Sequence, residues 1–375
     1  MTTKKKLLTL LAIMAVIIVI GVLIIKLTGN DRISTIQEEE DKFQIVTTFY
    51  PMYIIGANVA GQLEDVEVTN LTDFNTGCAH DYQLTPNNMK LLSTADVIII
   101  NGGGLEGFLE DIIKDYPNLT VIDTSRDIQM LPYANHDEHN HGNHDHDEDE
   151  HEHEHHDISD DEHNDSGYTD SNYDSNIEDN HEHGDYNPHI WLDPQIYIKQ
   201  IENVKGGLLN YIEGISSSLE TNSSVLELST AIEHNADNYI KEVQLIDDML
   251  SDLKDKITSG AVNSGESLGV AIFHDSFSYL ANRIGLKVEY SIEIDAETAL
   301  SSSNIRDVIE LVKVGRVKYL LADVQYGDTI ADRIQSESDS RVTLLDTVVT
   351  GDGDRSSYIK GMEENIKLLD KLIVY

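Results

Sequence analysis

Short apolar runs alternate along most of the chain with longer segments whose apolar residues recur at helical spacing. Apolar strands that alternate with helices indicate a parallel sheet covered on both faces. The pattern occurs on both sides of a central helical segment, so we expect an α/β fold of two lobes, each a mainly parallel sheet flanked by helices. The predicted strands span 43–49, 66–71, 95–101, 119–123, 270–273, 286–294, 317–323 and 342–346. The predicted helices span 52–61, 105–116, 277–284, 302–315, 328–336 and 358–372.

The central segment, 223–257, predicts one long helix. Its apolar residues recur at helical spacing from Val225 and Leu226 to Leu250, and no Gly or Pro interrupts it. We expect this rigid helix to join an N-terminal lobe, 43–222, to a C-terminal lobe, 258–375. A connection of this kind would resist a wide hinge motion between the lobes.

The N-terminal segment, 1–29, has the pattern of an export signal or a membrane anchor. Three lysines at 4–6 precede an uncharged apolar run at 7–25, close to the roughly 20 residues that cross a bilayer as a helix. The lysines predict a cytoplasmic N-terminus. No small-residue cleavage site is evident, so an uncleaved anchor is favoured over a cleaved signal. A polar stalk, 30–42, follows, and the remainder is expected at the extracellular face of the cytoplasmic membrane.

Charge narrows the possible partners. The chain has 68 Asp and Glu against 26 Lys and Arg, a formal net charge of -42. Nucleic acids and anionic membrane surfaces would repel such a chain, whereas cations would be attracted. The single cysteine, Cys78, excludes an intrachain disulfide and lies too far along the chain to anchor a lipid.

A segment at 135–186 differs in kind from the rest of the first lobe. It is nearly all His, Asp, Glu, Asn, Ser and Gly, and it holds 12 of the 16 histidines. Such a composition cannot bury a core and predicts a disordered loop. Dense imidazoles bind zinc, copper or nickel at many weak sites, although a solvated acidic linker is the alternative. The candidates for accessory metal capture are His136, His139, His141, His144, His146, His151, His153, His155 and His156.

Four histidines lie outside this loop. His80, His189 and His274 lie in loops or just beyond a predicted strand, where α/β folds place functional groups. His234 falls inside the long helix, where a solvated face is the expected position. The first three are therefore the candidates for a specific site.

Several motifs in order resemble the zinc and manganese solute-binding proteins of bacterial ABC transporters. The resemblance runs from about Phe43 to the C-terminus, and each motif alone would be weak. The motifs are Val46-Thr-Thr-Phe-Tyr-Pro51, Gly77-x-x-His80-Asp-Tyr82 with Thr85-Pro86, Asn101-Gly-Gly-Gly-Leu-Glu106, the His-rich loop, Pro188-His-Ile-Trp-Leu-Asp-Pro194 and Phe273-His-Asp-Ser-Phe277.

The resemblance implies a metal site in the cleft between the lobes, with His80, His189 and His274 as ligands. The fourth family position falls after the strand 342–346, which makes Asp346 the candidate. Asp346 could instead cap the next turn, with water or another carboxylate completing the site. Members of the family often have Glu-Pro before the first ligand. This chain has Cys78-Ala79, which loosens that loop and brings a thiol near His80.

Three imidazoles with one carboxylate suit tetrahedral zinc, whereas manganese members of the family typically carry a carboxylate at the position of His274. The resemblance therefore implies a zinc-binding component, not an enzyme, that delivers zinc to an ABC permease and is expected to act as a monomer. The alternatives are a manganese-binding homologue or an extracellular zinc buffer or adhesin. A zinc hydrolase is disfavoured because no helix-borne His-x-x-x-His pair or nucleophile motif accompanies the ligands.

Overall fold

The computed structural model describes residues 42–77, 80, 82–134, 186–216, 223–264, 268–273, 275–292, 302–325, 335–338 and 340–374. The predicted anchor 1–29, most of the His-rich loop and most of the predicted helix 328–336 lie outside these residues. Among the described residues, no helix is long and apolar enough to cross a membrane.

The first lobe is built on a four-stranded parallel sheet of order β2-β1-β3-β4. Its strands are β1 (Phe43–Thr47), β2 (Val66–Asn70), β3 (Val97–Ile100) and β4 (Thr120–Asp123). Its helices are α2 (Tyr50–Val59), α3 (Pro86–Thr94), η2 (Gly107–Leu109), α4 (Glu110–Ile113), η3 (Ile190–Leu192) and α5 (Pro194–Ser216).

The second lobe repeats the arrangement with a parallel sheet of order β6-β5-β7-β8. Its strands are β5 (Gly269–Phe273), β6 (Lys287–Ile292), β7 (Tyr319–Asp323) and β8 (Arg341–Leu345). Its helices are η4 (Asp275–Phe277), α7 (Ser278–Arg283), α8 (Ser302–Lys313) and α10 (Ser357–Val374). The two-lobed α/β architecture predicted from the sequence is confirmed.

Successive strand residues pack into different cores, because side chains alternate between the two faces of a sheet. In β3, Val97 and Ile99 belong to the largest core cluster, whereas Ile98 belongs to a smaller cluster that contains Leu92 of α3. The strand β5 divides in the same way between the largest cluster and one covered by α8. The largest cluster contains side chains of both sheets, so one continuous core links the lobes.

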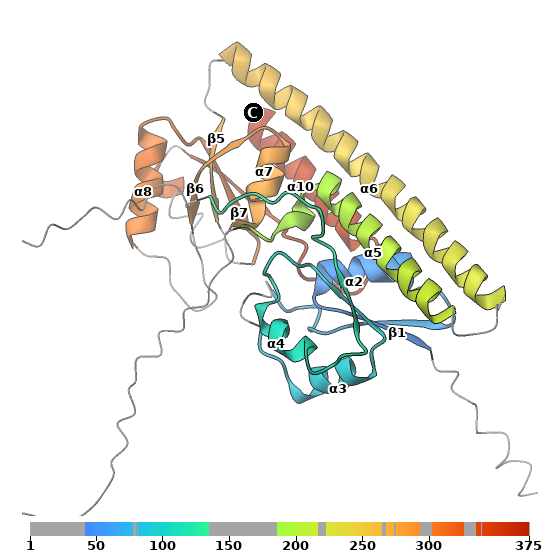
Figure 1. The fold of residues 1–375 in the computed structure, drawn as a ribbon. Coiled ribbons are helices and arrows are strands. Elements are labelled where there is room, and N and C mark those ends of the chain that lie inside the picture. The colour runs from blue at the N-terminus through green and yellow to red at the C-terminus, as the bar shows by residue number, and fades with distance from the viewer. Residues whose placement is uncertain are drawn as a thin grey trace, which may run out of the picture.

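The helix α6 (Ser223–Ser264) runs along both lobes, as the long helix in Figure 1 shows. It packs against α2 and α5 of the first lobe and against α7 and α10 of the second. Its buried spine steps by four and three residues alternately, the pattern of a helix with one apolar face. The spine comprises Ile232, Ala236, Tyr239, Val243, Ile246, Leu250, Leu253 and Ile257.

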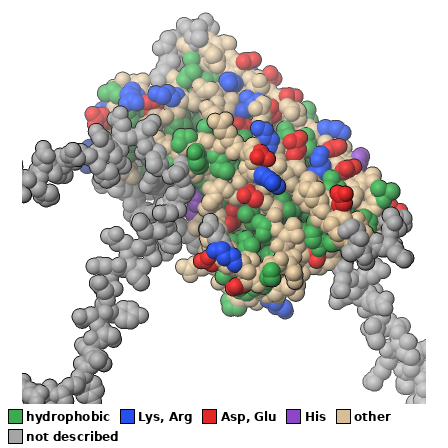
Figure 2. All heavy atoms as spheres, viewed as in Figure 1, with side chains coloured by type: hydrophobic (Ala, Val, Ile, Leu, Met, Phe, Trp, Pro, Cys, Tyr) green, Lys and Arg blue, Asp and Glu red, His purple; other side chains and the backbone are tan. Residues whose placement is uncertain are grey.

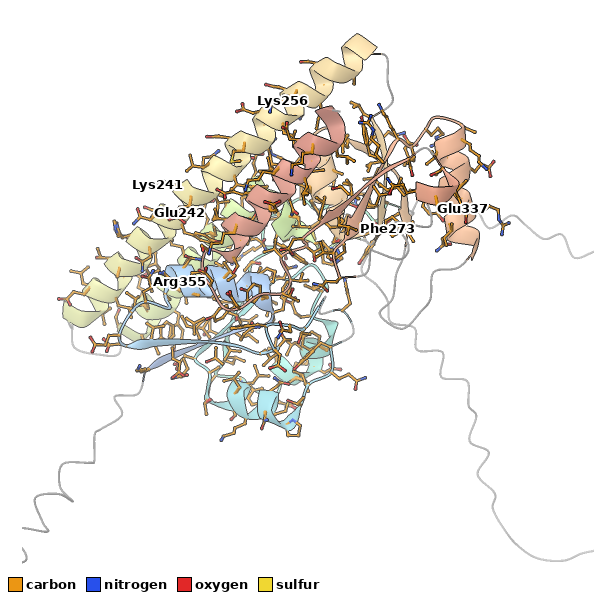
Figure 3. The ribbon with its side chains drawn as sticks, turned by 180° about the vertical axis from the view of Figure 1, so that it is seen from behind. Lys241, Glu242, Lys256, Phe273, Glu337 and Arg355 are labelled. Carbon is orange, nitrogen blue, oxygen red and sulfur yellow. The ribbon has the colours of Figure 1, made fainter. Side chains whose placement is uncertain are left out.

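Two details of this helix differ from the prediction. It ends at Ser264 instead of Ile257. Leu226, which the periodicity assigned to the apolar face, is 71% exposed. The outer side of α6 carries charged side chains, among them the labelled Lys241, Glu242 and Lys256, which are all exposed (Figure 3).

Charges of both signs are intermingled over the face of the molecule drawn in Figure 2. This face of the described residues therefore offers no broad basic patch of the kind that tracks a nucleic acid backbone.

Candidate metal centre

Two of the four predicted ligands lie side by side. The Nε2 atoms of His80 and His189 are 3.3 Å apart, and their ring centroids are separated by 5.0 Å. His189 is 1% exposed and precedes η3, while His80 is half-buried. Two imidazoles 109 positions apart in sequence therefore present the same nitrogen to one point of the first lobe.

The tautomer of a neutral His189 ring follows from its contacts with Asn187. The backbone N–H of His189 donates to Asn187 Oδ1 at 3.0 Å, while Asn187 Nδ2 donates to the carbonyl of Asp275 at 2.8 Å. These two bonds fix the orientation of the amide, because only an oxygen can accept and only the NH2 can donate. Nδ1 of His189 lies 2.8 Å from the same Oδ1 and must be its donor. The neutral ring then keeps an unprotonated Nε2, facing His80.

The separation of the two Nε2 atoms fits a shared tetrahedral ion. Zinc–nitrogen bonds of 2.0–2.1 Å place two ligands of a tetrahedron about 3.3–3.4 Å apart. The observed 3.3 Å matches that edge. Without an ion, the two nitrogens can share one proton as a hydrogen bond, for which His80 would be the donor.

His274 and its surroundings cannot be placed in the same way, because His274 lies outside the described residues. Its neighbours on both sides are described: Phe273 ends β5, a central strand of the second sheet, and Asp275 begins η4. Cys78, Ala79 and Asp81 also lie outside the described residues.

Asp346 follows β8 directly and is half-buried. One of its oxygens accepts from the backbone N–H of Val348 at 2.7 Å, so the turn-capping role is present. The side chain of Asn365 accepts a hydrogen bond from the backbone N–H of Asp346 and donates one to the Asp346 carbonyl. Burial raises the pKa of the Asp346 carboxyl, as it does the pKa of Asp323 at the end of the neighbouring strand β7.

Among the described residues, no group of three or more His, Cys, Asp or Glu side chains is placed to hold a metal ion. The pair His80 and His189 is what the structure brings together from the predicted set. The nine histidines assigned to accessory capture lie outside the described residues.

The two ends of the His-rich segment meet beside this pair. Pro132 and Tyr186 form an isolated antiparallel bridge, and the N–H of Asn187 donates to the Leu131 carbonyl at 2.8 Å. The segment therefore leaves and re-enters the fold at one point, three residues before His189.

A buried carboxylate supports the loop next to His189. Glu106 accepts from the Thr48 hydroxyl at 2.8 Å and from the N–H groups of Asn101 and Gly102. The side chain of Asn101 then donates to the Pro188 carbonyl at 2.9 Å. These three hydrogen bonds lower the pKa of Glu106, but burial raises it by more, to about 7.

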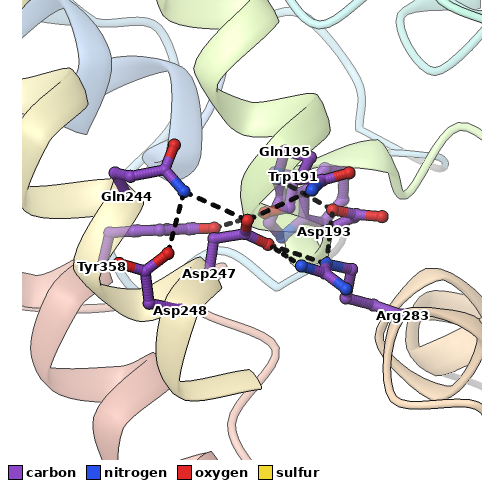
Figure 4. A network of polar contacts seen from close by, with 8 residues as sticks. All are labelled: Trp191, Asp193, Gln195, Gln244, Asp247, Asp248, Arg283 and Tyr358. Carbon is purple, nitrogen blue, oxygen red and sulfur yellow. Dashed lines mark hydrogen bonds and ion pairs between the residues drawn. The ribbon is translucent and has the colours of Figure 1, made fainter. Parts of the chain in front are cut away.

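The segment that carries His189 also contacts the second lobe through Asn187, Trp191 and Asp193. Asn187 reaches the turn after β5, and Trp191 Nε1 donates to the Thr347 carbonyl after β8 at 2.9 Å. Asp193 lies 4.0 Å from Arg283 of α7, and Arg283 is paired with Asp247 of α6 (Figure 4). Asp275, which begins η4, and Thr347, which follows Asp346, are thus both tied to this segment.

The supporting roles of these residues were not predicted from the sequence, although Asn101, Glu106, Trp191 and Asp193 lie within its motifs. Asn187 stands one residue before the motif that begins at Pro188, yet its partners lie in the other lobe. The signal for a role was its position next to a candidate ligand, but no local pattern identifies a partner 88 positions away.

Most of the chain matches a known protein family. The model of a family described as the periplasmic zinc-uptake complex component A matches residues 45–372. The zinc-binding lipoprotein AdcA of Streptococcus pneumoniae is 22% identical over 339 residues, which cover 89% of this chain and 56% of that protein. The high-affinity zinc uptake system protein ZnuA of Yersinia pestis is 24% identical over 322 residues, covering 85% of this chain and 88% of that protein. The chain thus spans just over half the length of the first relative.

Solved structures share the architecture. The solute-binding protein FpvC from Pseudomonas aeruginosa, in complex with Mn2+, superposes with a TM-score of 0.61 at 19% identity, covering 89% of this chain and 98% of that one. Zn(II)-bound AdcA from Streptococcus pneumoniae gives a TM-score of 0.60 at 19% identity, covering 89% of this chain and 58% of that one. At such identities the similarity establishes the fold.

Proposed function

Since the chain belongs to the family of the periplasmic zinc-uptake complex component A, we propose that it captures zinc outside the cytoplasmic membrane and delivers it to the permease of an ABC importer. The observation that carries this proposal is the pair of Nε2 atoms of half-buried His80 and buried His189, set one tetrahedral edge apart. Zinc is cargo here, and the protein is a binding component without catalytic activity.

The proposed ligands are His80, His189, His274 and Asp346. The ties of Asn187 to Asp275 and of Trp191 to Thr347 support this set, because each tie holds the residue that follows one of the second-lobe ligands. One carboxylate oxygen of Asp346 caps its turn, and the second oxygen would be the ligand. Three nitrogens with one oxygen favour zinc over manganese.

We assign the His-rich segment to capture. Its two ends are bridged at Pro132 and Tyr186, so imidazoles near either end are tethered within a few residues of His189. Many weak sites held there raise the local zinc concentration, as any tethered ligand does. The family description and the lipoprotein relative support a position on the outer side of the membrane, held by the segment 1–29 or released after its cleavage.

A metal titration tests the proposal. The full chain and a form lacking 136–185 are titrated with zinc and with manganese, with a competing chelator for the tight site. The deletion is geometrically feasible because the Pro132–Tyr186 bridge already brings its ends together. We expect one tight zinc ion in both forms and additional weak ions in the full chain alone.

Matched histidine variants locate the tight site. His189→Ala should abolish tight binding, whereas His234→Ala should not, because His234 is exposed on α6 and contacts Asn238 of the same helix. Tight manganese with weak zinc would make the chain a manganese-binding homologue. Absence of any tight ion from the form lacking 136–185 would leave only buffering by the loop.

A further inference from the structure

We propose that Asn187 is a positioning residue that holds His189 and the turn after β5 in one metal-binding arrangement. The expected effect on zinc rests on the proposed function, whereas the hydrogen bonds of Asn187 are present without a metal ion. Asn187 is fully buried, and each end of its side-chain amide is bonded to a different lobe.

The oxygen end of the amide controls the ring of His189. Oδ1 accepts from the backbone N–H of His189 at 3.0 Å and from its Nδ1 at 2.8 Å. A hydrogen bond at Nδ1 selects the tautomer whose Nε2 can bind a metal, and it fixes the ring plane. Asn187 therefore does for His189 what carboxylates or carbonyls do for histidines in other metal sites.

The nitrogen end of the amide controls the other lobe. Nδ2 donates to the carbonyl of Asp275 at 2.8 Å, and Asp275 directly follows His274. One planar group thus links a first-lobe ligand to the residue beside a second-lobe ligand. Since the amide is rigid, a shift of the turn after β5 must either break this bond or move the Nδ1 partner of His189.

The backbone of Asn187 is held independently of its side chain. The hydroxyl of Tyr279 donates to the Asn187 carbonyl at 2.7 Å and accepts from the N–H of Leu131 at 2.9 Å. The N–H of Asn187 donates to the Leu131 carbonyl. Burial raises the pKa of Tyr279 to about 12, so its proton is retained. Substitutions of the Asn187 side chain therefore leave both of these backbone hydrogen bonds of Asn187 in place.

Three variants of the full chain test the proposal. Asn187→Leu keeps the side-chain volume and removes both ends of the amide. Asn187→Asp keeps an acceptor for Nδ1 but places an oxygen against the Asp275 carbonyl. Asn203→Leu is the matched control, because Asn203 donates to two backbone carbonyls in the first lobe, those of Thr124 and Arg126.

The first readout is zinc affinity, measured by competition with a chelator. Loss of a partner that orients a metal-binding histidine costs about 10- to 100-fold in affinity, and this is the loss expected for Asn187→Leu. Asn187→Asp should bind more tightly than Asn187→Leu, because it still orients the ring. Asn203→Leu should bind like the parent. Equal losses in Asn187→Leu and Asn203→Leu, or parent-like binding by Asn187→Leu, would overturn the proposal.

The second readout needs no metal. Nitrogen NMR of histidine-labelled, metal-free protein reports which ring nitrogen carries the proton, with the His189 signals identified by their loss in His189→Ala. The parent and Asn187→Asp should hold the proton on Nδ1, and Asn187→Leu should lose this preference. An unchanged tautomer in Asn187→Leu would refute the assignment. If Asn187→Leu changes the tautomer but the parent binds no tight zinc, the proposed function is refuted and the positioning role of Asn187 stands.

Discussion

The ion pair between Arg283 and Asp247 joins the second lobe to the connecting helix, and its removal gives a prediction of defined size. Their side chains are 12% and 6% exposed, and Asp193 of the first lobe lies 4.0 Å from the same guanidinium, 13% exposed. Replacing Arg283 by Met preserves most of the packing and leaves two buried carboxylates without their cation. Removing one partner of a buried pair typically costs about 3–5 kcal/mol.

The structure places the expected loss near the lower end of that range. Asp247 keeps two amide donors after the substitution, since Gln195 and Gln244 each donate to its Oδ2 at 3.2 Å (Figure 4). We therefore expect Arg283→Met to lower the free energy of unfolding by about 3 kcal/mol. The control is Lys205→Met, because the partner of Lys205, Asp237, is 56% exposed. Surface pairs of this kind contribute under about 1 kcal/mol.

Urea unfolding of the parent, both single variants and Arg283→Met combined with Asp247→Leu measures these differences. The double variant should recover most of the loss, because well-packed apolar residues often replace a buried ion pair at no cost. The deficit of Arg283→Met should also grow as pH rises from about 4. Burial raises the pKa of Asp193, and Arg283 opposes that rise. Without Arg283 the pKa of Asp193 in the folded protein is higher still, so the variant loses more stability than the parent as the pH rises. A loss under about 1 kcal/mol, or an unrecovered double variant, would refute the reasoning.

Three further predictions concern a carboxyl group, the metal site and the core. Burial raises the pKa of Glu106 from 4.5 to about 7, so the unfolded chain loses this proton first as pH rises. The parent should lose about 3 kcal/mol of stability relative to Glu106→Gln between about pH 4 and 8, and a constant difference in urea unfolding would contradict this. Zinc affinity should fall about 10- to 100-fold per pH unit below about 6, since imidazoles must be neutral to bind; an unchanged affinity would exclude the histidine site. Leu250→Ala should lower the free energy of unfolding by about 2–5 kcal/mol, because Leu250 is fully buried. Leu245 is 64% exposed, so Leu245→Ala should change thermal unfolding little.

How far the sequence predicts the fold depends on how local the signal is. The spine of α6 could be predicted because its apolar residues repeat every three and four positions along one helix. The helix continues past Ile257 without such a repeat, since residues 258–260 are all exposed and include Gly260. The predicted helix 105–116 was too long, and the structure has a short 3-10 turn and one α-turn there.

One missed helix could have been predicted. The helix α5 begins with Pro194, a favoured first helical residue, and buries Tyr197, Ile201, Val204, Leu208 and Ile212 at helical spacing. The periodicity that predicts α6 is therefore present in this segment too.

The candidate site could be predicted only as separate residues. His80 and His189 were singled out by their positions and by the family motifs, and their Nε2 atoms do converge. The residues that hold them could not be predicted, because Asn187, Trp191 and Arg283 make contacts between segments far apart in the chain. Such contacts depend on how the two sheets face each other, and no local periodicity encodes that.

These contacts also bear on how an ion could leave. Both imidazoles of the described pair belong to the first lobe, and their spacing already equals the edge of a zinc tetrahedron. Rotation of one lobe against the other would have to break the ties of Asn187, Trp191 and Arg283 and expose part of a core shared by both sheets. Each tie attaches to a short turn or to α7, so a displacement of the turns after β5 and β8 disturbs far less buried surface. In the proposed site, the first-lobe pair would therefore be the preorganised half, and a displacement of the second-lobe turns would change the affinity.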